Sequence, residues 1–324
     1  HAISMEGKLI WEFRTGGEVF STPCVHRGKI YIGSKDGFVY AIDPKTGKEI
    51  WKFRTGGEIA CSAAAEDNRI FIASFDENMY CLDSETGEEI WRFRTGEEII
   101  CCAPFLVHNN VLYFGSIDNY LYAVDTKTGK EIWRFRTGKY GNSSIPAAYN
   151  NILFHGCRDG ILYALDLKTG KEIWRFETEG GMTGSNPVVV NGIVYFSEEA
   201  GNIYALTLEG KEVWKSRTGG ANWATPAIKD NIIFFGSADC HLYALDMTNG
   251  KELWRFATSN QTKCDIPPPY DIFEATVKKP QTEEEAKEGE KYESEIGRQD
   301  FESQYSMKSE YVMKSEYKQE GEYK

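Results

Sequence analysis

Short apolar runs separated by polar turns are the dominant pattern of this chain. In the stretch after Trp11, residues 19–25, 29–33, 38–42 and 48–54 each fit a short strand, and Tyr40 and Ile42 alternate with the smaller Ala41. Residues 34–37 and 43–47 contain the Asp and Gly that suit tight turns. No ten-residue stretch has a 3.6-residue period, so the pattern predicts four-stranded β units and excludes helical repeats.

Seven of the eight tryptophans mark a repeat, with spacings of 40, 40, 42, 41, 40 and 40 residues. The phrase at residues 46–56 returns almost unchanged at residues 128–138 and, with variations, in every other unit. Four short strands per 40-residue unit predict an all-β fold, a single β-propeller of four-stranded antiparallel blades. We interpret the repeated tryptophans as packing residues between neighbouring blades. They are Trp11, Trp51, Trp91, Trp133, Trp174, Trp214 and Trp254.

The number of blades depends on how the two ends meet. A Trp-containing strand at residues 8–14 precedes six full units, and residues 265–270 resemble the start of another unit, residues 144–149. An open sheet edge invites aggregation, so we expect the N-terminal outer strand to pair with C-terminal strands. This predicts seven blades, with six or eight as the alternatives.

Two regions follow from these patterns, a propeller over residues 6–277 and an acidic insertion and tail over residues 278–324. Residues 278–290 are charged and poor in apolar side chains, which is typical of a flexible segment. From Phe301 to Tyr317 aromatic and Met residues fall on odd positions. This period of two fits a strand that completes the last blade, a strand that docks on a partner, or a disordered tail.

The composition excludes several classes of protein. The net charge of −12 argues against nucleic-acid binding. No apolar run approaches the ~18 residues of a membrane-spanning helix. Eight scattered cysteines favour a reducing, cytoplasmic location, with export as the alternative if a signal peptide was removed. We expect a monomer.

The repeated phrase Thr-Gly-Lys-Glu-Ile-Trp-Arg-Phe, preceded by Gly-Ser-x-Asp-Gly-x-x-Tyr-Ala-x-Asp, resembles the pyrroloquinoline-quinone-like propeller repeat family over residues 6 to about 275. The resemblance implies the propeller fold but not one function. The family contains quinoprotein dehydrogenases, which bind the quinone and calcium in the central funnel. It also contains the propeller lipoprotein of the bacterial outer-membrane assembly machine, which binds proteins.

Candidate site residues lie near the start of each unit, where the first strands of a propeller meet at the central channel. Small residues two positions before the first-strand proline are expected to line this channel: Ser21, Cys61, Cys102, Ser144, Ser185, Ala224 and Asp265. The candidates for the channel mouth or for cofactor binding are Cys101, Cys102, Asn142, Asn222, Trp223, Cys264 and Asp265. The crowding of strands at the axis is the competing explanation for the small residues.

No residue set predicts catalysis. The recurrent turn aspartates, such as Asp36 and Asp76, each stand alone in their loops, so we interpret them as turn-stabilising rather than calcium-binding. We therefore predict a non-enzymatic binding or scaffold propeller that presents its channel mouth and loop face to a protein or a small ligand, with no required cofactor. The alternative is a quinone-dependent dehydrogenase that binds pyrroloquinoline quinone and calcium.

Overall fold

A computed structural model describes residues 1–100, 105–182 and 185–259 of the chain. The chain divides into two compact units, His1–Ile272 and Phe273–Lys324, and every described residue belongs to the first. The predicted boundary after Val277 and the acidic tail lie outside the described residues. In the described part no helix is long and apolar enough to cross a lipid bilayer.

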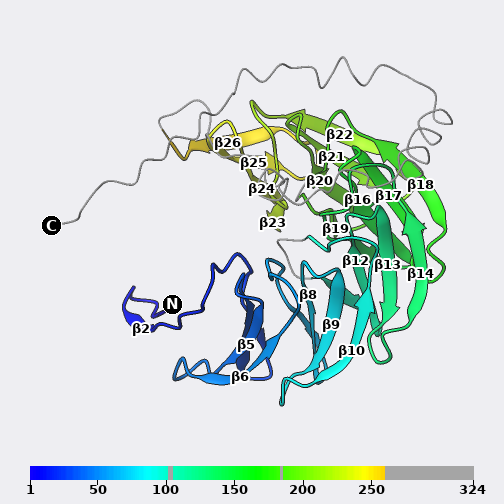
Figure 1. The fold of residues 1–324 in the computed structure, drawn as a ribbon. Helices are drawn as coiled ribbons and strands as arrows, with labels where there is room; N and C mark the ends of the chain where they lie inside the picture. Colours follow the sequence, from blue (N-terminus) through cyan, green and yellow to red (C-terminus); the bar gives the residue numbers. More distant parts are fainter. Residues whose placement is uncertain (101–104, 183–184, 260–324) are drawn as a thin grey trace, which may run out of the picture. The chain divides into compact units, whose positions relative to one another are not determined.

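The described secondary structure is all β: six four-stranded antiparallel sheets and one two-stranded sheet (Figure 1). In each four-stranded sheet, or blade, the strands lie in chain order, so hairpins alone connect them. Blades 1 to 3 comprise β3 (Cys24–His26), β4 (Lys29–Gly33), β5 (Phe38–Ile42) and β6 (Glu49–Arg54); β7 (Ala64–Glu66), β8 (Arg69–Ala73), β9 (Asn78–Asp83) and β10 (Glu89–Arg94); and β11 (Leu106–His108), β12 (Val111–Gly115), β13 (Tyr120–Asp125) and β14 (Glu131–Arg136).

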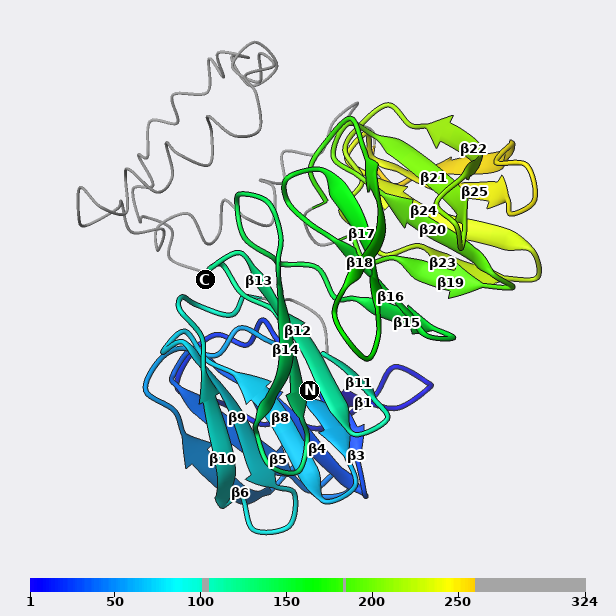
Figure 2. The ribbon, with the colours of Figure 1, turned by 90° about the vertical axis from the view of Figure 1, so that its right-hand side faces the viewer.

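The remaining strands repeat this arrangement, and the second view shows the strands of each blade side by side (Figure 2). Blades 4 to 6 comprise β15 (Ala147–Tyr149), β16 (Ile152–Gly156), β17 (Ile161–Asp166) and β18 (Glu172–Glu177); β19 (Val188–Val190), β20 (Ile193–Ser197), β21 (Asn202–Thr207) and β22 (Glu212–Arg217); and β23 (Ala227–Lys229), β24 (Ile232–Ser237), β25 (His241–Asp246) and β26 (Glu252–Ala257). The two-stranded sheet pairs β1 (Ala2–Ile3) with β2 (Leu9–Trp11).

The first strand of a blade is shorter than the sequence pattern predicts. Residues 19–25 were expected to form a strand, but β3 contains only Cys24–His26. Pro23 has no N–H to give to a ladder, and the preceding N–H of Thr22 donates to the hydroxyl of Ser62 in the next unit, at 2.8 Å. The segment before Pro23 therefore crosses towards the next blade and leaves the sheet.

The repeated tryptophans connect consecutive blades, which confirms the fold prediction. Trp51 on β6 is 9% exposed, and its Nε1 donates to the carbonyl of Ser84 in the turn between β9 and β10, 3.2 Å away. That turn carries Gly87, whose φ of +76° places its Cα against the indole; a Cβ there would lie 2.6 Å from the ring. The same Trp-to-turn contact joins Trp11 to Pro44, Trp91 to Thr126, Trp133 to Leu167, Trp174 to Leu208 and Trp214 to Met247.

Of the strand predicted at residues 8–14, only Leu9–Trp11 form a strand, β2, and its described partner is β1. β2 also packs on blade 1, because the ring of Phe13, just beyond it, contacts Tyr40 edge-on at 5.3 Å between centroids. The predicted pairing of this N-terminal strand with C-terminal strands, and with it the number of blades in the closed ring, involves residues after Ser259 that lie outside the described part.

Candidate ligand pocket and partner-binding surface

The turn aspartates act within the fold. The Asp36 carboxylate accepts hydrogen bonds from the Tyr40 hydroxyl and the Gly16 N–H, both at 2.7 Å, and from the Phe38 N–H at 3.0 Å. Partial burial opposes ionisation, but these donors outweigh it and lower the pKa of Asp36. Asp76, Asp118 and Asp239 repeat the arrangement with Tyr80, Tyr122 and Tyr243. In the described residues no group of three or more His, Cys, Asp and Glu side chains could hold a metal ion.

The small residues expected to line the channel are mostly buried. Ser21 donates to the Gly33 carbonyl at 2.9 Å and accepts from the Gly33 N–H at 3.1 Å, so its side chain binds the end of β4. Ser185 Oγ accepts from the Ser197 N–H at 3.2 Å and lies 2.9 Å from the Ser197 hydroxyl, and the Ser144 hydroxyl donates to the Gly156 carbonyl. Ala224 is exposed. In these three units the hydroxyl therefore binds the start of the unit to the end of its second strand.

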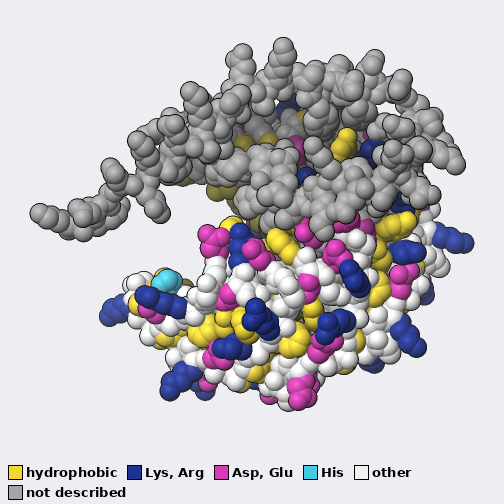
Figure 3. Space-filling view, in the orientation of Figure 1, with side chains coloured by type: hydrophobic (Ala, Val, Ile, Leu, Met, Phe, Trp, Pro, Cys, Tyr) yellow, Lys and Arg dark blue, Asp and Glu magenta, His cyan; other side chains and the backbone are white. Residues whose placement is uncertain are grey.

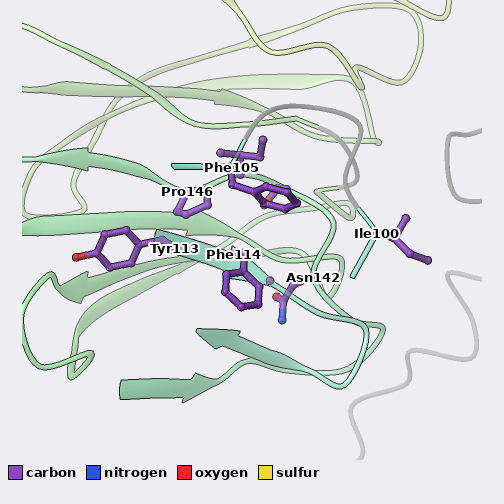
Figure 4. A pocket seen from close by; sticks show the side chains of 9 residues that line it. Ile100, Phe105, Tyr113, Phe114, Asn142 and Pro146 are labelled. Carbon is purple, nitrogen blue, oxygen red and sulfur yellow. The ribbon is translucent and has the colours of Figure 1, made fainter. Parts of the chain in front are cut away.

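A small pocket, too narrow to enclose a ligand-sized cavity, lies between blade 3 and the segment that starts blade 4 (Figure 4). Its lining is mostly apolar and includes Ile100, Phe105, Tyr113, Phe114, Ile145 and Pro146. Asn142 and Ser144 supply its polar atoms. Of the predicted site residues, the structure brings Asn142 to this pocket.

Asn142 is fully buried within a polar network. Its Nδ2 donates to the Thr137 hydroxyl at 3.0 Å, and its Oδ1 lies 2.9 Å from Nε2 of His155 on β16. Burial lowers the pKa of His155 to about 3, so the imidazole is neutral and donates through Nε2. The buried Nδ1 of His155 has no hydrogen-bond partner among the described residues. Sequence analysis did not single out His155, because equivalent positions hold Ile32, Ile72 and Phe114.

Asn222 and Trp223 lie at the corresponding start of blade 6. Asn222 is fully buried and accepts from the Thr218 hydroxyl at 3.3 Å, whereas its Nδ2 and the Nε1 of Trp223 are buried without a partner among the described residues. A ligand role for Asn142, Asn222 or Trp223 stays a prediction. The other predicted site residues, Cys101, Cys102, Cys264 and Asp265, lie outside the described part.

The fourth strands carry a repeated exposed stripe that sequence analysis did not single out. On β6, β10, β14 and β18 the Trp and Phe face the next blade, while on all six fourth strands the aliphatic residue before the Trp is between 44% and 51% exposed. These rim residues are Ile50, Ile90, Ile132, Ile173, Val213 and Leu253. The signal was present in the phrase Glu-Ile-Trp-Arg-Phe, whose alternation sends Ile to the face opposite Trp.

Basic side chains flank the rim residues. The Arg92 guanidinium forms two hydrogen bonds with Glu89, at 2.8 and 2.6 Å, and lies 5.2 Å from the ring centre of Tyr80. Arg94, one of the recurrent arginines of the sequence, pairs with Glu77 at 2.8 Å. Figure 3 shows hydrophobic side chains at the surface interspersed with basic and acidic ones. On β10 the exposed Ile90 therefore has charged neighbours, Glu89, Arg92 and Arg94, along the same strand.

These repeats and their packing match a known family. The model of the family described as outer membrane protein assembly factor BamB matches residues 1–60, 35–175 and 158–269. The chain belongs to the BamB family. No curated protein matches it.

Solved structures share the BamB-family fold at low sequence identity. The crystal structure of BamB from Moraxella catarrhalis matches with a TM-score of 0.66 and 17% identity, over 76% of this chain and 77% of the other. The quinohemoprotein alcohol dehydrogenase ADHIIG from Pseudomonas putida HK5 matches with a TM-score of 0.66 and 16% identity, over 78% of this chain but only 62% of the dehydrogenase. The computationally designed Ika8 protein matches with a TM-score of 0.50 and 16% identity, over 77% of this chain and 89% of the other. The chain is therefore a β-propeller protein.

Proposed function

We propose that this protein is a non-enzymatic scaffold that binds another protein along the rim residues of its fourth strands. The observation that carries the proposal is the recurrence of a half-exposed aliphatic side chain at the same position of six consecutive blades. An apolar centre with a charged border is the usual composition of a protein-binding surface. The fourth strand is also the edge of its sheet, so a partner strand can add its backbone hydrogen bonds there.

The hydrogen bonding of the polar residues supports binding over catalysis. The Asp36 carboxylate already accepts hydrogen bonds from a tyrosine and a backbone N–H group. The Ser21 hydroxyl already hydrogen-bonds to the backbone of Gly33. The BamB family name denotes an assembly factor, which supports a protein as the partner. The dehydrogenase match shares the fold at 16% identity and carries no activity to this chain.

The described residues do not fit a quinone and calcium site. Calcium needs six to eight oxygen ligands, including clustered carboxylates. The aspartates equivalent to Asp36 lie one to a blade, and Asp36 already accepts hydrogen bonds from a tyrosine and from backbone N–H groups. We therefore propose that no cofactor is required. We favour the rim over the pocket between blades 3 and 4 as the binding surface. The polar side chains of that pocket, Asn142 and Ser144, already form hydrogen bonds within the protein.

Site-specific photo-crosslinking in an extract of the source organism tests the rim. A photoreactive residue at Ile132 is expected to yield a discrete adduct with one polypeptide, and the same residue at the exposed turn position Lys127 is not. Excess unlabelled protein should compete for the adduct, whereas the variant Ile90→Lys/Ile132→Lys/Ile173→Lys should not. Equal labelling from both positions, or full competition by the variant, would contradict the rim as the binding surface.

Reconstitution with pyrroloquinoline quinone and calcium tests the enzymatic alternative. We expect no stoichiometric quinone binding and no dye-linked dehydrogenase activity. Either result would replace the scaffold proposal. The cytoplasmic location suggested by the eight scattered cysteines of the sequence remains a proposal, for which subcellular fractionation is the direct measurement.

A further inference from the structure

The fourth strands are basic although the protein is acidic. Each fourth strand and the residue before it make a seven-residue segment, and the six segments contain 15 Lys and Arg residues but only eight Glu residues. Their net charge is therefore +7, whereas the net charge of the whole chain is −12. The rim residues thus lie in strands whose charge is opposite to that of the protein, which favours a negatively charged partner there.

In five blades the cation that follows the Trp packs on an aromatic ring of the third strand. The distance from the cation to the centre of the ring is between 5.1 and 5.5 Å. These cations are Lys52, Arg92, Arg134, Arg175 and Lys215. Because the ring already restricts each of these side chains, the side chain loses less conformational entropy when a partner binds it.

Blade 1 places two cations on one ring. Nζ of Lys52 and Cζ of Arg54 each lie 5.5 Å from the centre of the Phe38 ring. Lys52 also forms a long ion pair with Glu49, at 3.5 Å, whereas Arg54 forms no ion pair within the described part of the chain. The two cations are two residues apart on β6, so their side chains lie on the same face of the sheet. The end of β6 therefore carries more positive charge than its own carboxylate neutralises.

Blade 4 provides a natural comparison for blade 1. β18 has the sequence of β6 except that one basic residue replaces another after the Trp and that Glu177 replaces Arg54. The rim residues of the two strands are similarly exposed, Ile50 at 44% and Ile173 at 51%. The two strand edges therefore offer the same apolar side chain but opposite charge at the strand end.

We propose that an extended acidic segment of the partner binds along the edge of β6, a conclusion that rests on the proposed function of the rim. β6 is the last strand of its sheet, so a partner strand can be added at its edge. Every second side chain of an added strand points to the same face, which is the spacing of Lys52 and Arg54. The partner segment therefore has carboxylates at two alternate positions, opposite these cations, and an aliphatic residue two positions further on, beside Ile50.

Two fluorescent peptides test the charge preference, the acidic Thr-Asp-Thr-Asp-Thr-Val-Thr and the neutral Thr-Asn-Thr-Asn-Thr-Val-Thr. A photoreactive residue at Ile50 reports binding at β6, and the same residue at Ile173 reports binding at β18. At Ile50 the acidic peptide should reach half of its maximal adduct yield at a concentration about fivefold lower than the neutral peptide, because two opposite-charge pairs form. At Ile173 the acidic peptide should have no advantage, because Glu177 repels it.

Charge-reversal variants separate pairing at β6 from general attraction. Lys52→Glu/Arg54→Glu should lose the acidic preference at Ile50 and bind Thr-Lys-Thr-Lys-Thr-Val-Thr instead, which also shows that the variant is folded. Lys45→Glu/Lys127→Glu changes the net charge by the same amount in two exposed turns and should keep the acidic preference.

Three results would overturn the acidic partner. Equal half-maximal concentrations of the acidic and neutral peptides at Ile50 would do so while leaving the rim as a protein-binding surface. Equal loss of the preference in both charge-reversal variants would reduce it to general attraction. An adduct between two copies of the protein, formed from Ile50 without peptide, would assign the edge of β6 to a second copy of the chain.

Discussion

The hydroxyl of Tyr40 lies 2.7 Å from the carboxylate of Asp36, four residues earlier in the chain. The same carboxylate oxygen also accepts from Gly16, which belongs to the preceding unit. One carboxylate thus connects the hairpin turn, the third strand and the neighbouring blade. Burial, the hydrogen bond to Asp36 and the negative charge of Asp36 together raise the pKa of Tyr40 to about 12. The phenol therefore stays a donor at physiological pH.

Asp36→Ala should destabilise the protein by about 2 kcal/mol, because it removes charge-assisted hydrogen bonds to three donors. Urea unfolding followed by tryptophan fluorescence measures the change. Glu49→Ala is the control, since Glu49 forms only an exposed ion pair with Lys52 at 3.5 Å and should cost less than about 1 kcal/mol. Equal losses in the two variants would refute a structural role for Asp36.

Gly170→Ala should cost about 2 kcal/mol more than Gly192→Ala. Both glycines have positive φ, at +67° and +78°, so both variants strain the backbone. A Cβ at Gly170 would lie 2.5 Å from the Trp133 ring, whereas at Gly192 the nearest atom is a Leu208 methyl group at 3.9 Å. Chemical denaturation of the two variants gives the difference, and a difference near zero would show that the indole can move away freely.

Ser21→Ala should destabilise the protein by about 1–2 kcal/mol, because it leaves the buried Gly33 N–H and carbonyl without the hydroxyl that both contact. The neighbouring Thr22 side chain is exposed, and Thr22→Ala should change stability by less than about 0.5 kcal/mol. Thermal unfolding of both variants compares them. A neutral Ser21→Ala would favour the channel-lining role that the sequence suggested.

The buried His155 predicts a specific acid sensitivity. Its pKa is about 3 in the folded protein and about 6.5 in an unfolded chain, so only the unfolded state binds the proton between these values. Stability attributable to His155 is therefore complete above pH 6.5 and decreases as the pH falls towards 3, with a slope of up to roughly 1.4 kcal/mol per pH unit.

The variant Asn142→Ile/His155→Ile should reduce this slope, because it copies the Ile59 and Ile72 pair of blade 2 at the same 13-residue separation. Replacing both polar partners also avoids an orphaned buried group, so stability near pH 7 should change little. Urea unfolding at several pH values compares the variant with the native protein. An unchanged slope would mean that His155 does not remain neutral in the folded state.

Tryptophan spacing, turn chemistry and strand alternation were enough to predict the four-stranded blades and the structural role of the repeated tryptophans. These features are local, and each repeat confirms the others. The length of the first strand was not predictable from alternation, because Thr22 gives its N–H to Ser62 in the next unit. The pairing of Ala2–Ile3 with β2 was also not predicted.

Site residues were harder to predict because burial depends on contacts between blades. Asn142 and Asn222 were candidates for a channel mouth, and both side chains are fully buried. His155 was not predicted as a site residue, because the equivalent positions of other units are apolar. The sequence also could not show that the Asn142 side chain contacts it. In the sequence, rim residues such as Ile132 look like ordinary strand positions. Only the structure shows that the equivalent side chain is half-exposed in all six blades.

The contact between each tryptophan and the next turn has a consequence for how such chains change in length. Trp91 recognises the turn at Gly129 by features that every described turn shares, so deleting one 40-residue period would join two surfaces that still match. The contact between one blade and the next therefore does not depend on the total number of repeats. The number of blades must then depend on the curvature that brings the last blade into contact with the first. A chain that gains or loses whole repeats would fold into a closed ring only if its new curvature allows that contact.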